Sequence, residues 1–203
     1  MLHVRKRLHA HLGAVTSLSV SKAHSFILSG AGPPGAASVV LWDANRPRFI
    51  RVLCGGLETP PPCITVSETG SMVVLCCGRQ CRVVTINGAP LATIEVDSNG
   101  DRFTAGAPVR APEWCSDHAV VVTGHANGCV RIWRLAPLKL PGVKRYGPGW
   151  RSVAGGEGQQ QLTLDLLTLC ERSHKECVTC VSFSTDMPPV MFTGDAAGQV
   201  VQW

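Results

Sequence analysis

The chain has 203 residues, of which 45% are hydrophobic and only 16% are charged, and its formal net charge is +5 at pH 7. These proportions exclude a wholly disordered chain, because disordered chains are poor in apolar residues. No run approaches the roughly 20 apolar residues that cross a bilayer, and the N-terminus has no apolar core of signal-peptide length. We therefore expect a soluble, intracellular protein with scattered surface charge.

The apolar segments are short and rich in Val and Thr, and Gly and Pro lie between them, which predicts strands rather than helices. The first series contains "VTSLSVS" (15–21), "SFILSG" (25–30) and a third strand ending in Trp42. A second series starts with "PPCITVS" (61–67) and continues with "SMVVLC" (71–76). The two series match without gaps, so the chain contains a repeat.

Two later segments repeat the same design. "VVVTGHANGCVRIW" ends in Trp133 and "VMFTGDAAGQVVQW" ends in Trp203, each nine residues after the glycine of a Thr-Gly pair. The expected tryptophan position of the second series falls on Thr85, so that series has lost its tryptophan. The surplus length between the last two tryptophans lies in 136–161, which is rich in Pro and Gly, basic and then Gln-rich, and which we expect to be an inserted flexible loop.

The repeat resembles the signature of WD repeats. A histidine precedes the first strand, a Ser/Thr-Gly pair ends the second, and "LWD" (41–43) or "RIW" (131–133) closes the third. The resemblance implies an all-β fold, a β-propeller of four-stranded blades. We expect blades at about 14–54, 61–97, 101–171 and 175–203. The residues that define the repeats are His11, Ser29, Trp42, Asp43, Thr123, Gly124, Trp133, His174, Thr193, Gly194 and Trp203.

About four blades rarely close a ring, and the last one ends before a fourth strand. We therefore expect an incomplete part of a larger propeller, with a compact four-bladed ring and an open array as the alternatives. The aspartate that the family places six residues before the tryptophan is replaced by Asn127 and Ala197. We expect the hydrogen-bond network of Trp, Ser/Thr, His and Asp to be incomplete in every blade.

A narrower resemblance lies in 8–30 and 110–135, where the sequence is similar to the C-terminal WD repeats of BEACH-domain proteins. That family implies a non-catalytic scaffold in vesicle trafficking or autophagy, which binds other proteins or peptides and is cytoplasmic, peripheral to endomembranes. The alternative is a WD-repeat ribonucleoprotein or nucleic-acid factor that uses the basic segments 3–7 and 144–151 against phosphate. The candidate partner-binding residues are Arg110, Trp114, His125, Asn127, Arg131 and Trp150.

The chain offers little for chemistry. Motifs of serine hydrolases, P-loop proteins and zinc proteases are missing, so we expect no catalytic residue and no cofactor. "CERSHKECVTC" (170–180) has zinc-like spacing, but Cys177 and Cys180 would point to opposite faces of a strand. We therefore assign its Cys and His residues to repeat positions rather than to zinc, and we expect the ten cysteines to be free thiols. The weaker metal candidates are Cys76, Cys77, Cys81, His3, His9 and His11.

Overall fold

Short antiparallel sheets make up the part of the chain that the structure describes, which is a computed structural model. The described residues are 6–67, 72–96, 101–109, 120–137, 150–153, 162–171, 173–184 and 190–203. Every helix or strand assigned in these ranges is a strand. Among them, no helix has the length and apolar character needed to cross a membrane.

The first two sheets are meanders in which neighbouring strands in the sequence pair with one another. The first sheet runs in the order β1 (Val15–Ser21), β2 (Phe26–Ala31), β3 (Ala37–Asp43) and β4 (Arg48–Leu57). The second contains β5 (Cys63–Val66), β6 (Met72–Cys77), β7 (Gln80–Thr85) and β8 (Pro90–Val96). Apolar β-branched residues on both faces of these strands suit a sheet that is covered on both sides.

The last two sheets follow the same plan. The third runs in the order β9 (Phe103–Val109), β10 (Val120–His125), β11 (Val130–Pro137) and β13 (Leu162–Cys170). The fourth has three strands, β14 (Val178–Phe183), β15 (Met191–Asp195) and β16 (Val200–Gln202). The expected all-β propeller blades are confirmed.

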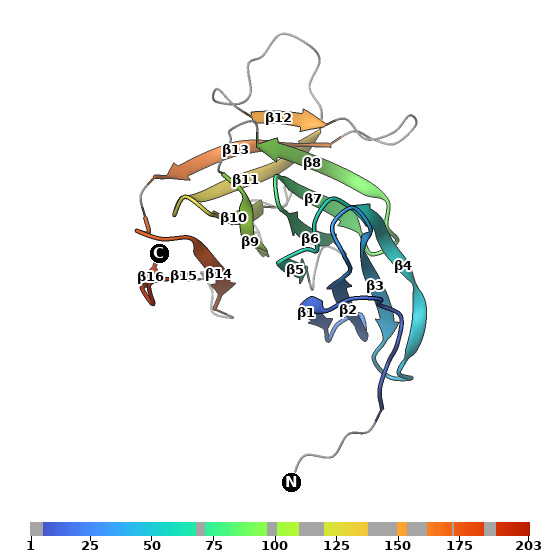
Figure 1. The fold of residues 1–203 in the computed structure, drawn as a ribbon. Helices are drawn as coiled ribbons and strands as arrows, with labels where there is room; N and C mark the ends of the chain where they lie inside the picture. The colour runs from blue at the N-terminus through green and yellow to red at the C-terminus, as the bar shows by residue number, and fades with distance from the viewer. Residues whose placement is uncertain are drawn as a thin grey trace.

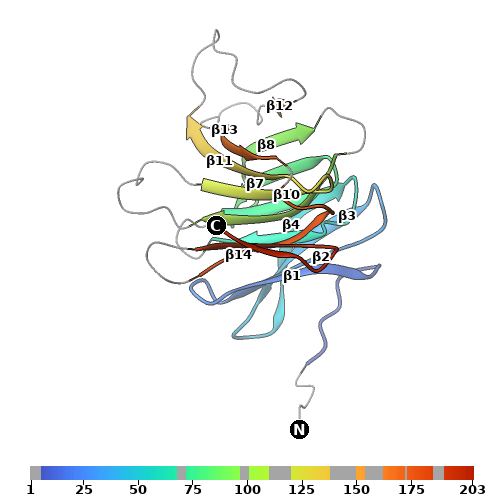
Figure 2. The same cartoon turned by 90° about the vertical axis from the view of Figure 1, so that its left-hand side faces the viewer.

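The four sheets form an open arc (Figure 1). Their first strands β1, β5, β9 and β14 lie on the inner side of the arc, and β4, β8 and β13 lie on the outer side. The view from the side shows the sheets stacked against one another (Figure 2). The first and last sheets do not meet, so the ring is not closed, as expected of an incomplete propeller.

Hydrophobic clusters fill the spaces between neighbouring sheets. One cluster joins the first and second sheets through Leu28, Val39 and Leu75, all fully buried. Another joins the second and third around Trp133 and Phe103, which are also fully buried. Burial of apolar surface is the main favourable term in folding, so the sheets of this arc stabilise one another rather than each folding on its own core.

The interval 136–161 contains regular structure where we expected a loop. Residues 136 and 137 end β11, and the short strand β12 (Trp150–Val153) pairs antiparallel with β8. The insertion from the third sheet therefore adds a fifth strand to the outer edge of the second, and pairing covers an edge that would otherwise be open. The rest of the interval lies outside the described residues.

The second sheet also corrects the position assigned to its lost tryptophan. Its hairpin between β6 and β7 is tight, with Cys77 opposite Gln80 and Gly78 at a φ of 59°. In the first and third sheets, the tryptophan (Trp42 or Trp133) pairs with the residue that stands two positions before Ser29 or Thr123. In the second sheet the residue at that position is Val73, and it pairs with Val84. The shorter hairpin thus moves the equivalent position from Thr85 to Val84.

Candidate interaction site

Side chains of the fourth sheet and the loop before it form a complete hydrogen-bond network of Trp, Thr, His and Asp. The Trp203 indole N–H donates to Thr193 Oγ1 at 2.9 Å, and the same oxygen lies 2.7 Å from His174 Nε2. His174 Nδ1 lies 3.2 Å from Asp195 Oδ2. Because the carboxylate accepts, Nδ1 carries the proton and the Thr193 hydroxyl donates to Nε2. The expectation that the network would be incomplete is wrong for this sheet, because the acid is Asp195, two residues before Ala197.

The third sheet has a related network, in which the positions of acid and imidazole are exchanged and an arginine links the two. Trp133 Nε1 donates to Thr123 Oγ1 at 2.8 Å, and His125 Nε2 lies 2.9 Å from that oxygen. His125 directly follows the Thr-Gly pair, where the fourth sheet has its aspartate. The acid is Asp101, which precedes β9 and lies 3.5 Å from His125 Nδ1. The expectation of an incomplete network holds here for the link between acid and histidine, because Asp101 Oδ1 has no hydrogen-bond partner.

Arg131 joins this third-sheet network as a fifth member. Its Nη1 lies 3.1 Å from Asp101 Oδ2 and 2.9 Å from His125 Nδ1. Burial raises the pKa of Asp101, but its interactions with His125 and Arg131 lower it more, so the carboxyl stays ionised at neutral pH. Burial lowers the pKa of His125 against the opposing effect of Asp101, so the ring is neutral at pH 7.

The first and second sheets are simpler. In the first, Trp42 Nε1 and His11 Nε2 both lie 2.7 Å from Ser29 Oγ, but Ala31 occupies the place of the acid. In the second, Leu75 replaces the hydroxyl residue and lies within the apolar core. The expectation of an incomplete network therefore holds for these two sheets.

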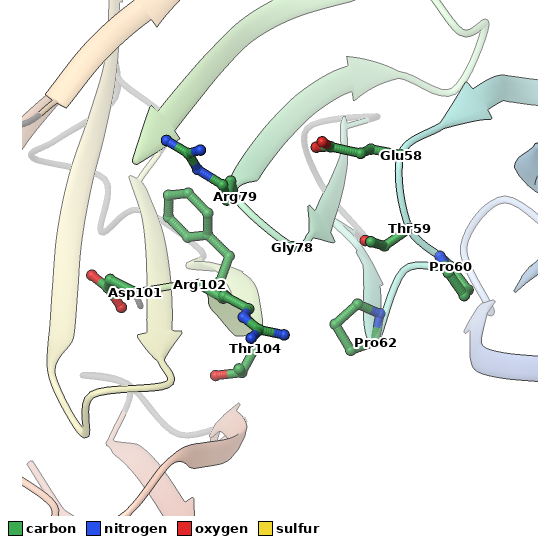
Figure 3. A pocket seen from close by; sticks show the side chains of 10 residues that line it. Glu58, Thr59, Pro60, Pro62, Gly78, Arg79, Asp101, Arg102 and Thr104 are labelled. Carbon is green, nitrogen blue, oxygen red and sulfur yellow. The ribbon is translucent and has the colours of Figure 1, made fainter. Parts of the chain in front are cut away.

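A pocket of about 560 Å³ opens between the loops of the second and third sheets (Figure 3). Its lining side chains come from the loop before β5, the β6–β7 turn and the start of β9. Exposed charged residues of both signs surround apolar walls. The lining residues are Glu58, Thr59, Pro60, Pro62, Gly78, Arg79, Asp101, Arg102, Phe103 and Thr104.

Backbone contacts hold the pocket in shape. The Phe103 N–H donates to the Gly78 carbonyl at 2.8 Å, which ties the second sheet to the third. The N–H of Ala126 donates to the Arg102 carbonyl at 3.0 Å, so the β10–β11 turn supports the loop that carries Arg102. The Arg79 side chain donates two hydrogen bonds to the Val96 carbonyl, at 3.0 and 2.7 Å. The pocket is therefore largely preformed, as ligand-binding clefts usually are.

The third-sheet network reaches the wall of this pocket. Asp101 belongs to both, and the Phe103 ring lies 4.8 Å, centre to centre, from the His125 ring. The hydroxyl of Thr59, another lining residue, is buried without a hydrogen-bond partner. An unsatisfied buried hydroxyl costs free energy unless a ligand or water completes it.

The residues predicted to contact partners differ in their exposure in the structure. His125 and Arg131 are buried in the network, so they support the pocket wall and do not form a contact surface. Asn127 is exposed in the β10–β11 turn, where its Oδ1 accepts from the Cys129 N–H at 3.1 Å. Arg110 and Trp114 lie outside the described residues, and Trp150 begins β12.

Sequence reasoning missed Asp101, Asp195 and the pocket residues. One signal for Asp195 was present, since "TGH" and "TGD" place a polar residue directly after the Thr-Gly pair in both segments. Asp43, predicted as part of the repeat, caps its own turn instead and accepts from the Asn45 and Arg46 N–H groups at 3.0 Å each.

Several candidate metal residues have other partners, and His3 lies outside the described residues. Both ring nitrogens of His174 are occupied by Thr193 and Asp195, and Cys180 is exposed on β14. In the ranges that the structure covers, no three potential metal ligands converge. Hydrogen bonds from Cys63 and Cys81, together with burial, hold the pKa of Cys76 well above its usual value, and burial raises that of Cys77 to about 12. Both thiols are buried and protonated, and Cys76 is one of the core residues between the second and third sheets.

Comparisons with known proteins agree with the repeats. The family described as WD domain, G-beta repeat, matches residues 3–43 and 100–134. The chain is 31% identical over 69% of its length to mouse WD repeat- and FYVE domain-containing protein 4. It is 28% and 27% identical over its whole length to Protein SPIRRIG and BEACH domain-containing protein A2 of Arabidopsis thaliana. It spans only 4–6% of the length of these curated relatives.

Solved structures give the same fold. RRP9 WD40 repeats align with a TM-score of 0.65 at 16% identity, over 97% of this chain and 49% of theirs. U3-55K aligns with a TM-score of 0.59 at 13% identity, over 97% of this chain and 53% of the other. Propellers of this kind are in general non-catalytic scaffolds that bind other proteins. The chain is therefore part of a WD-repeat β-propeller, and its sequence is similar to proteins of the BEACH type.

Proposed function

We propose that this chain is the protein-binding part of a larger scaffold in vesicle trafficking or autophagy, and that it holds an extended segment of its partner in the pocket between the second and third sheets. The similarity to BEACH-type proteins supports the cellular role. A cytoplasmic location, peripheral to endomembranes, belongs to the same proposal. The single observation that carries the binding site is the preformed pocket with exposed charges at its mouth.

The lining residues indicate the chemistry of the partner. Arg102 is exposed, and its backbone is fixed by the β10–β11 turn, so its guanidinium suits a carboxylate at the mouth. Pro60, Pro62 and Phe103 provide an apolar wall for a neighbouring aliphatic or aromatic side chain. A hydrogen bond from the Thr59 hydroxyl, which is buried and lacks a partner, to the backbone of the segment belongs to the same proposal and requires a small opening of the pocket wall. We therefore expect an acidic residue next to an apolar one in the bound segment.

Selection of peptides from a displayed random library tests this site. The purified chain should enrich peptides with an acidic residue beside an apolar one. A selected peptide should lose at least tenfold in affinity for Arg102→Glu and keep its affinity for Lys175→Glu, a reversal of charge at an exposed residue that does not line the pocket. Equal affinity for both variants would contradict the proposed pocket.

Binding of a single-stranded RNA oligonucleotide at several salt concentrations addresses the ribonucleoprotein alternative. RNA affinity that falls steeply with salt, together with no enrichment of peptides, would favour that alternative. For the cellular role, the full-length protein carrying Arg102→Glu should fail to support trafficking or autophagy when it replaces the natural protein in cells. Full rescue of trafficking or autophagy by this variant would show that the pocket is not needed for that role.

A further inference from the structure

The second sheet differs from the other three at the glycine of the repeat. In the first, third and fourth sheets, the residue after the hydroxyl residue of the network is Gly30, Gly124 or Gly194. Each glycine pairs with a residue on the first strand of its sheet, and these partners are Ser17, Ala105 and Cys180. The corresponding pair in the second sheet is Cys76 on β6 and Cys63 on β5. Among the four described sheets, only the second therefore places two thiols opposite each other at this position.

The third sheet makes room for the side chain of Cys76. In the first sheet the glycine is in close contact with the next sheet, since a Cβ at Gly30 would lie 2.5 Å from Pro61 Cγ. At the next junction the facing residue is itself a glycine, and a Cβ at Gly106 would lie 2.8 Å from Cys76 Sγ. The glycine that permits the close approach thus lies on the third sheet instead of the second.

Three thiols lie side by side across the second sheet. Directly opposed positions on β5, β6 and β7 hold Cys63, Cys76 and Cys81. The thiol of Cys76 is hydrogen-bonded to both of the others. Cys76 and Cys81 are fully buried, whereas Cys63 is half-buried. Cys63 is therefore the thiol of this row that a small molecule reaches first.

The positions of Cys63 and Cys76 suit a disulfide. Facing residues of antiparallel strands have Cα atoms about 4.5–5.5 Å apart, and a disulfide needs about 4.4–6.8 Å. The hydrogen bond with Cys76 lowers the pKa of the Cys63 thiol more than burial raises it, which favours the thiolate, the form that attacks an oxidant. The sheets on both sides of the pair belong to the described chain, so its packing is defined by residues that the structure shows.

We propose that Cys63 and Cys76 are a redox-sensitive pair that closes to an intramolecular disulfide on exposure to hydrogen peroxide. The Cys63 thiolate attacks one peroxide oxygen and becomes a sulfenic acid, and the other oxygen leaves as hydroxide and takes up a proton to give water. The Cys76 sulfur then attacks the sulfenic sulfur, the S–O bond breaks, and the departing hydroxide takes the Cys76 proton to give a second water. Two thiols are thus oxidised to one disulfide while one peroxide is reduced to two waters.

Closure of the pair removes one contact between the second and third sheets. Cys63 Sγ and Thr65 Oγ1 both donate to the Gly106 carbonyl, at 3.3 and 2.8 Å. A sulfur in a disulfide has no proton to donate, so only the Thr65 bond remains after oxidation. Pro62, which directly precedes Cys63, lines the pocket between these two sheets. The disulfide itself does not rest on the function proposed for that pocket.

Peptide mapping of the peroxide-treated chain tests the proposal. The purified chain is reduced, freed of reductant, exposed to hydrogen peroxide, unfolded in an alkylating reagent, and digested with trypsin and a glutamate-specific protease. Cleavage after Glu58, Glu68 and Arg79 separates the peptide 59–68, which holds Cys63, from 69–79, which holds Cys76 and Cys77. We expect these two peptides to be linked by a bond that a dithiol reductant cleaves, with no cross-linked dimer on a non-reducing gel.

Three variants assign the two thiols. Cys63→Ser can still donate to the Gly106 carbonyl, as Ser17 does to the Pro61 carbonyl in the first sheet, and Cys76→Ala removes only the sulfur. Both should keep the natural far-ultraviolet circular dichroism and lose the linked peptides. Cys76→Ala should stop at the sulfenic acid of Cys63, which dimedone labels. Cys180→Ser, a change at an exposed cysteine, is the control and should form the link as the natural chain does.

Three results would overturn the redox pair. The first is oxidation of Cys180 by peroxide while Cys63 and Cys76 are both recovered as alkylated thiols. The second is Cys63 oxidised beyond the sulfenic acid with no link to 69–79. The third is a link from 69–79 to the Cys81 peptide, 80–82, in place of the link to 59–68.

Discussion

Asp101 and Asp195 lie beside the histidines of neighbouring blades but stand at different places in the two sheets. Each carboxylate lies beside a histidine whose ring meets the threonine that accepts the tryptophan N–H. Asp195 ends the second strand of its blade, whereas Asp101 precedes the first strand of its own. The exchange places Asp101 at the wall of the pocket, so the network that stabilises the third blade also fixes the candidate binding site.

Removing the shared hydroxyl of the third blade should destabilise the chain. Thr123→Val keeps the shape of the side chain but leaves the Trp133 N–H without its acceptor, and Trp133 is fully buried. We expect the free energy of unfolding to fall by about 1–3 kcal/mol, the cost of an unsatisfied buried polar group. Urea denaturation measures the loss. Thr168→Val, at an exposed position on β13, serves as the control, and equal stability of the two variants would contradict the assigned network.

Acid should weaken the fold in two stages. Burial lowers the pKa of His125 and that of His11 below the 6.5 of an exposed histidine, so below this pH the unfolded chain binds more protons than the folded one. The free energy of unfolding must then decrease as the pH falls below about 6.5. The pKa of Asp101 is lowered from 3.8, so its contribution is present above that pH and is lost as the pH falls further.

Urea midpoints at several pH values between 7.5 and 5 test the first stage. His125→Gln should show a smaller decrease of the free energy of unfolding over this range than the natural chain. His9→Gln, which changes an exposed histidine, should show the natural decrease. Identical pH dependence in all three proteins would exclude His125 as a source of the effect.

The junction between the third and fourth blades predicts a specific compensation. Gly124→Ala adds a methyl group that overlaps the Val178 side chain, and overpacking of this kind costs about 1–3 kcal/mol. Val178→Ala creates room, so the double variant should lose less stability than the sum of the two single variants. Denaturation of the four proteins in a double-mutant cycle gives the coupling energy. Gly55→Ala, at an open position, should be neutral, and strict additivity at Gly124 and Val178 would contradict the close approach.

Thr59→Val should affect stability and binding in opposite directions. The hydroxyl of Thr59 is buried without a partner, so its removal should leave the free energy of unfolding unchanged or raise it by up to about 1 kcal/mol. If that hydroxyl bonds the bound segment, affinity for a selected peptide should fall. Thermal unfolding and peptide titration of the same variant measure the two effects. A destabilised variant with natural affinity would contradict both parts.

Much of the fold could be predicted from the sequence because each blade repeats the same local pattern. The Thr-Gly pair and the tryptophan identify the second and third strands, and the spacing of the tryptophans identifies the number of blades. The tight β6–β7 hairpin was not predictable by counting, since a turn shorter by one residue moves the tryptophan position from Thr85 to Val84.

The candidate site was less accessible to sequence reasoning. The pocket is formed by loops of two blades, and the path of the loops depends on contacts such as that between Gly78 and Phe103, which are distant in the sequence. The role of Asp195 was not predicted because the acid was expected at a fixed spacing of six residues before the tryptophan. Asp101 was not predicted because acid and histidine exchange their positions in the third sheet. His125 and Arg131 were assigned to a contact surface because polar residues beside a turn are usually exposed.

The central claim is that the chain is an open arc whose inner junctions are sealed and whose two end faces are not. Hydrogen exchange of the chain, at a concentration where it is monomeric, tests this claim most directly. We expect strong protection of the amides of β6, β7, β10 and β11 and much faster exchange in β1 and β14–β16, which lack a covering sheet on one side. Equal protection of the end sheets and the inner sheets would contradict it.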